Sequence, residues 1–93
     1  MLNLIDVQTI IFKSLAHMTG GNPSYVRNKK LAQMGIISQP RFNGFVNDIY
    51  HGVAYYHHSL PNDAFDNINT SSTIADVENV VSTATPAPGG GNL

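Results

Sequence analysis

Apolar residues recur at three- and four-residue steps near the start of the chain, which predicts a helix over residues 3–18. Asp6 and Lys13 line the polar side of this helix. Ile10 falls toward that polar side, so we expect it to be exposed and to mark a contact surface. The predicted apolar face consists of Leu4, Val7, Ile11, Leu15 and Met18, widened by Ile5 and Phe12.

A second helix is predicted over residues 23–34. Asn22 can cap it, and Pro23 suits its first position, where the missing N–H costs nothing. Gly35 then ends the helix. The hydrophobic periodicity of this segment is poor, and basic residues interrupt its apolar side. We therefore expect a half-solvated helix, or one whose basic side meets an acidic partner.

The most continuous apolar face belongs to a third predicted helix, over residues 39–57, with Ser38 as its N-cap and Pro40 in its first turn. Gly44 and Gly52 lie on another face, although glycine inside a helix costs roughly 1 kcal/mol relative to alanine. Either they admit a close-packed neighbouring helix, or the fold tolerates this cost. The apolar face consists of Phe42, Phe45, Val46, Ile49, Tyr50, Val53 and Tyr56.

A fourth helix is predicted over residues 73–84, where Thr73 and Asp76 have the spacing of a capping box. The valine-rich stretch 77–83 leaves a strand as the alternative there. The fold class is therefore all-α, a small bundle of three to four helices with a flexible Pro/Gly-rich C-terminal tail. We expect one helical domain over residues 1–84 and the tail over 85–93.

Composition narrows the function classes. The 93 residues suffice for one domain, and the absence of cysteine excludes disulfides, thiolate nucleophiles and cysteine-based zinc sites. Only 12% of the residues are charged, well below the ~25% typical of soluble domains. Low charge weakens the repulsion between copies, so we expect the chain to bind itself or another protein.

The charges are unevenly distributed. Residues 1–41 hold five basic residues and one acidic residue, a balance of +4, whereas residues 42–93 hold five acidic and no basic residues, a balance of −5. This polarity suits a nucleic acid at the basic half, or a head-to-tail contact between copies. The candidate nucleic-acid contacts are Arg27, Lys29, Lys30 and Arg41.

The stretch LAQMGIISQPRF, residues 31–42, combines a short predicted helix, a turn at Gly35, the apolar Ile36 and a helix with a polar start. It resembles the helix-turn-helix family of DNA-binding proteins. That family also wants a small residue four positions before the glycine, where this chain has Leu31, and the would-be recognition helix has a single basic residue, Arg41. The resemblance implies DNA binding; a plain helix–helix corner is the other interpretation.

No pattern in the chain predicts catalysis. There is no nucleophile motif, no phosphate-binding glycine loop and no carboxylate pair on one predicted helix face, so we expect a non-enzymatic protein without a cofactor. The histidines of the third helix lack the three- or four-residue spacing of helical metal ligands, so we expect no metal site. The candidate interface residues are Tyr55, His51, His58, Gly44, Gly52 and Ile10.

The favoured hypothesis is a structural or assembly subunit that self-associates or docks into a larger complex, such as a viral or phage particle. The alternative is a small helix-turn-helix-like nucleic-acid-binding protein that uses the basic N-terminal half. No basic residue precedes the first apolar run, and no run reaches the ~20 residues that a bilayer span needs. We therefore expect no membrane contact, and a location in the cytoplasm or within an assembled particle.

Overall fold

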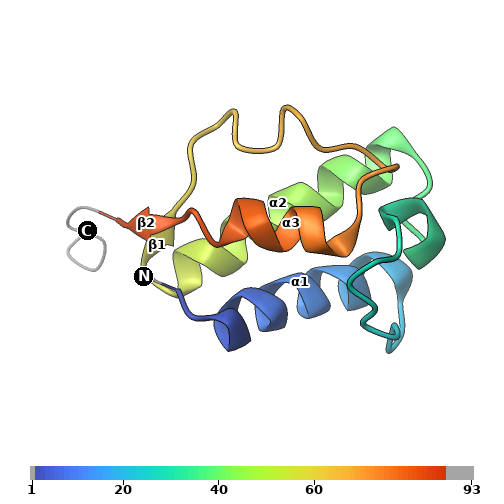
Figure 1. The fold of residues 1–93 in the computed structure, drawn as a ribbon, viewed down its shortest axis with the longest axis horizontal. Coiled ribbons are helices and arrows are strands. Elements are labelled where there is room, and N and C mark those ends of the chain that lie inside the picture. Colours follow the sequence, from blue (N-terminus) through green and yellow to red (C-terminus); the bar gives the residue numbers. More distant parts are fainter. Residues whose placement is uncertain (1, 88–93) are drawn as a thin grey trace.

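The computed structural model describes residues 2–87 and is mostly helical, as predicted (Figure 1). Helix α1 packs against both α2 and α3, and two short strands lie at the end of the molecule where the chain begins. The elements in chain order are α1 (Leu4–Thr19), a 3₁₀ turn (Leu31–Met34), α2 (Gln39–Tyr55), β1 (His58–Ser59), α3 (Ile74–Val81) and β2 (Thr85–Pro86).

Helices α2 and α3 begin at the caps that the sequence predicts. The Ser38 hydroxyl accepts a hydrogen bond from the Arg41 N–H at 3.3 Å. Thr73 and Asp76 form a capping box. The Thr73 hydroxyl accepts a hydrogen bond from the Asp76 N–H at 3.2 Å, and the Asp76 carboxylate accepts one from the Thr73 N–H at 3.0 Å. The valine-rich stretch after this box continues the helix up to Val81 and forms no strand. Local capping therefore decided its conformation.

The prediction of a helix over residues 23–34 is wrong: only the last four residues of this segment are helical, and they form a 3₁₀ turn. The preceding backbone instead pairs with the start of α3. The first two N–H groups of α3, those of Ile74 and Ala75, donate to the carbonyls of Lys29 and Arg27 at 3.0 and 2.9 Å. These carbonyls satisfy donors that the first turn of any helix leaves without a partner. The tertiary pairing therefore outcompetes a local helix with a poor apolar pattern.

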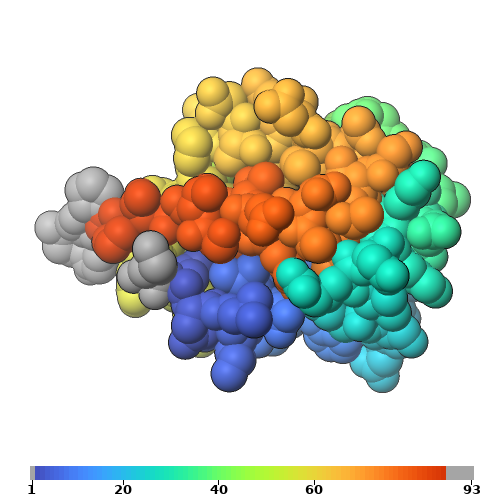
Figure 2. Space-filling view, viewed as in Figure 1, coloured from blue at the N-terminus to red at the C-terminus, as the bar shows by residue number. Residues whose placement is uncertain are grey.

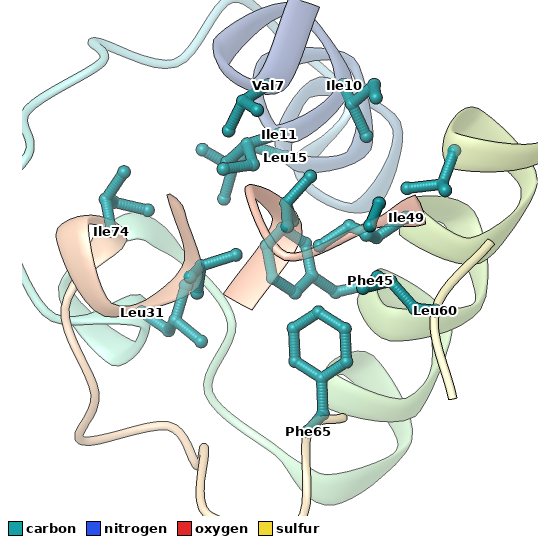
Figure 3. Close-up of a cluster of buried hydrophobic side chains, with 14 of the residues drawn as sticks. Val7, Ile10, Ile11, Leu15, Leu31, Phe45, Ile49, Leu60, Phe65 and Ile74 are labelled. Atoms are coloured by element: carbon teal, nitrogen blue, oxygen red, sulfur yellow. The ribbon is translucent and has the colours of Figure 1, made fainter. Parts of the chain in front are cut away.

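Helix α1 is turned about its axis relative to the predicted face. Ile10, expected to be exposed, is 3% exposed and belongs to the core, so this expectation is wrong. Leu4 and Ile5, expected in the core, are 59% and 74% exposed. Figure 3 shows Ile10 with Val7, Ile11 and Leu15 on the inner side of α1. The side chains buried below 2% exposure are Val7, Ile11, Leu15, Leu31, Ile36, Phe45, Ile49, Val53, Ile74, Val77 and Val81.

The two glycines of α2 explain this orientation. A Cβ atom built on Gly52 would lie 2.9 Å from Cγ2 of Ile10, and one built on Gly44 would lie 2.7 Å from Cε of Met18. Both distances are shorter than van der Waals contact. The glycines thus admit a closely packed neighbouring helix, the first of the two alternatives that the sequence left open, and that helix is α1 of the same chain.

Alanine at the two glycine positions should have different effects on stability. Gly52→Ala should lower the free energy of unfolding by about 1 kcal/mol, because overpacking against the stiff, buried Ile10 outweighs the gain in helix propensity. Gly44→Ala should leave stability unchanged or raise it by up to ~1 kcal/mol, because the end of Met18 can move aside. Urea unfolding of both variants checks this. Equal effects at the two positions would contradict the close contact at Ile10.

The beginning of the predicted tail is paired. Strands β1 and β2 are antiparallel, with His58 opposite Pro86 and Ser59 opposite Thr85. The Ala87 N–H then donates to the His57 carbonyl at 3.0 Å. The rest of the predicted tail, residues 88–93, lies outside the described residues.

Candidate binding surface

A buried carboxylate joins α3 to α1 and to the segment that precedes the 3₁₀ turn. The Glu78 side chain is 4% exposed. Its Oε1 accepts a hydrogen bond from Arg27 Nε at 2.7 Å, and its Oε2 accepts from the Tyr25 hydroxyl at 2.7 Å and from Gln8 Nε2 at 3.1 Å. These four side chains are called the Glu78 cluster below.

The Glu78 cluster is built to hold a charge rather than to move a proton. Burial raises the pKa of Glu78, but the hydrogen bonds from Tyr25, Arg27 and Gln8 and the charge of Arg27 outweigh it, so the net pKa is lowered. The pKa of Tyr25 is raised, first by burial and then by its bond to the Glu78 carboxylate. At neutral pH the carboxylate stays ionised and the phenol stays protonated, which makes the cluster a structural anchor.

An apolar groove lies beside this cluster. It has a volume of about 390 Å³, and Figure 2 shows the two surfaces that meet there, α1 in blue and the segment around residue 25 in teal, side by side below α3. Gln8 and Tyr25 belong to both the cluster and the groove, so the cluster fixes two of the groove walls. The lining residues are Ile5, Gln8, Thr9, Phe12, Lys13 and Tyr25.

Four of the lining residues follow one another along the outside of α1, at steps of three, one and three residues. We call Ile5, Gln8, Thr9 and Phe12 the outer stripe. Residues with this spacing share one helix face. The Thr9 hydroxyl donates to the Ile5 carbonyl at 2.8 Å, so it is satisfied within the helix. The outer stripe therefore presents mainly apolar atoms to the groove, with Ile5 exposed and the other three side chains half-buried.

The six candidate interface residues do not form one surface. Tyr55 is 80% exposed and contacts Tyr56 edge to face, with ring centroids 5.6 Å apart. His51 is exposed as well, whereas His58 is half-buried. Its Nδ1 lies 2.8 Å from the Tyr56 carbonyl oxygen, and its buried Nε2 has no hydrogen-bond partner among residues 2–87. The other three candidates lie inside the contact between α1 and α2: Gly44, Gly52 and Ile10.

Two of the four candidate nucleic-acid contacts are engaged within the chain. Arg27 is bound to the Glu78 carboxylate, and Arg41 Nη1 donates to the Met18 carbonyl at 2.9 Å. Lys29 and Lys30 are exposed, and neither forms an ion pair within the described residues. The first helix of the helix-turn-helix pattern is reduced to one 3₁₀ turn. The segment therefore lacks the first helix of a helix-turn-helix, which would support the recognition helix.

Metal ligands do not gather in the described part of the chain: between residues 2 and 87 no three His, Asp or Glu side chains are close enough to share an ion. His17 and Asp48 form a pair, in which His17 Nδ1 lies 2.5 Å from the Asp48 carboxylate. Over the same residues, none of the helices is both long enough and apolar enough to cross a bilayer.

Sequence reasoning missed both the Glu78 cluster and the outer stripe. The position of Glu78 could have indicated the cluster. It stands between Val77 and Val81 on the apolar face of α3, where a buried acid needs hydrogen-bond partners. The hydrophobic pattern places Ile5 and Phe12 on the predicted core face of α1. Their seven-residue spacing also fits a second apolar face on the opposite side of α1.

Comparison with known proteins adds nothing to this geometry. No family model matches the chain, and neither the curated proteins nor the solved structures contain a significant match.

Proposed function

We propose that this protein is a non-enzymatic subunit that binds another protein chain through the α1 groove, in a homo-oligomer or a larger assembly. The observation that supports this is the outer stripe with Ile5 at 74% exposure, next to a groove whose walls are fixed by the Glu78 cluster. Covering a side chain such as isoleucine gains about 1.5–3 kcal/mol, so a protein partner gains directly from this surface.

The chemistry of the surface favours binding over catalysis. Glu78, the one buried carboxylate among residues 2–87, is held by three donors and stays ionised, and the adjacent phenol stays protonated. An apolar centre with few charged residues is typical of the core of a protein–protein interface. The low share of charged residues, 12%, adds little repulsion against a partner or a second copy.

A photo-cross-linking experiment tests this function. p-Benzoylphenylalanine replaces Ile5 in the groove or, as the matched control, Ile37, which is 69% exposed and does not line the groove. We expect adducts from residue 5, and not from residue 37, with one defined protein chain identified by mass spectrometry, this chain included. The absence of protein adducts at residue 5, together with low-salt binding of a short DNA duplex that Lys29→Glu and Lys30→Glu abolish, would favour the nucleic-acid alternative.

A further inference from the structure

We infer that the partner in the α1 groove is a second copy of this chain, whose own α1 packs antiparallel across the outer stripe. This inference rests on the proposed function and specifies its partner. Residues at i, i+3, i+4 and i+7 form the contact seam of a packed helix pair, which is the spacing of the outer stripe. Such a contact is isologous, because the same surface is used by both copies.

The order of side chains along the outer stripe suits an antiparallel pair. A two-fold axis between Gln8 and Thr9 places Ile5 of each copy beside Phe12 of the other. The middle of the contact then holds Thr9, a short side chain whose hydroxyl is already bonded to its own helix, and Gln8, whose amide is bonded to Glu78. The two larger apolar side chains of each copy thus cover those of the other.

Charge complementarity points to the same arrangement. Asp6 and Lys13 lie seven residues apart on one flank of the outer stripe, and neither forms an ion pair with any of residues 2–87. In an antiparallel pair about a two-fold axis, equal flanks meet, so Asp6 of each copy faces Lys13 of the other. The axial offset is about two residues, or ~3 Å, which a lysine side chain spans. A parallel pair brings unequal flanks together and leaves these charges without partners.

Sedimentation equilibrium on four chains, the wild type and three variants, tests the pairing. We expect the wild-type chain to form a dimer whose dissociation constant rises with salt. In a Lys13→Glu dimer, Glu at position 13 of each copy faces Asp6 of the other copy, so like charges meet at two places. This should raise the dissociation constant about tenfold. Asp6→Lys combined with Lys13→Glu exchanges the charges, and should restore the wild-type value to within about threefold. Lys29→Glu is the matched control: it makes the same charge change away from the groove and should leave the dimer unchanged.

Mixing two single variants makes the test independent of helix stability. Asp6→Lys and Lys13→Glu chains should each dimerise weakly alone, while a mixture should form the heterodimer, because all its facing charges are opposite. Circular dichroism checks that each variant keeps its helix content.

The failures of the two proposals are distinguishable. A dimer that is indifferent to Lys13→Glu, or a chain that stays monomeric while residue 5 cross-links to a different protein, overturns the self-pairing but not the binding role of the groove. Absence of any protein adduct at residue 5 overturns both.

Discussion

Replacing Glu78 with glutamine is expected to lower the free energy of unfolding by about 2–3 kcal/mol at pH 7, because the hydrogen bonds made to a buried charged group are lost or weakened. Three donors converge on the Glu78 carboxylate, from Gln8, Tyr25 and Arg27. An amide offers one acceptor oxygen, and its NH₂ group would face one of these donors. The position is nearly closed to water, so no solvent molecule can compensate freely.

The same substitution should flatten the acid side of the stability profile. The folded-state pKa of Glu78 is lowered from its ordinary value of 4.5, so the unfolded chain takes up a proton before the folded chain does. The contribution of this carboxylate is therefore fully present above about pH 4.5 and is lost as pH falls through the folded-state pKa. Glu78→Gln has no proton to take up there, and should lose less stability than wild type between pH 5 and pH 3.

Urea unfolding at pH 7, 5 and 3 measures both effects. Asp66→Asn is the matched control, because it also removes one negative charge, but from an exposed side chain with no hydrogen bond within the described residues. It should change stability by less than about 0.5 kcal/mol at pH 7. An equal effect of the two substitutions would mean that Glu78 is not held by the cluster.

The Glu78 cluster connects stability to the proposed binding surface. Gln8 and Tyr25 each donate to the carboxylate and also line the groove. The groove walls are therefore held by the same interactions that join α3 to α1. A binding surface built in this way changes little in shape when a partner arrives, which reduces the ordering cost of association.

Local sequence signals predicted most of the helical structure. Ser38 and the Thr73–Asp76 capping box mark the starts of α2 and α3, and the periodic apolar positions that follow give the helix type. The segment 23–34 also has a strong local signal at Asn22-Pro23, yet it forms irregular backbone and turns that end in one 3₁₀ turn. Its conformation depends on pairing with α3, more than 40 residues later in the sequence, and no local pattern records such a partner.

The face of α1 that turns inward is also decided by a tertiary partner. Counting apolar residues favoured a face with Leu4 and Ile5, because α1 has apolar residues on two sides. The side that turns inward is set by α2, where Gly52 leaves room for Ile10. Gly52 and Ile10 can each be read from the sequence, but only the packed structure shows that they are in contact. Three of the candidate interface residues, Gly44, Gly52 and Ile10, lie in the contact between α1 and α2 for the same reason, while Tyr55, His51 and His58 stay predictions.

Ile10→Ala is expected to lower the free energy of unfolding by about 3 kcal/mol, whereas Ile5→Ala on the same helix should cost less than about 0.5 kcal/mol in the monomer. Ile10 is 3% exposed and fits against the bare backbone of Gly52, so truncation leaves a cavity that a rigid helix pair cannot close. Ile5 is 74% exposed, so its truncation removes little buried apolar surface from the monomer. Urea unfolding at protein concentrations low enough to keep the chain monomeric separates this effect from association. Equal costs at the two positions would contradict the orientation of α1, and would also return Ile5 from the outer stripe to the core.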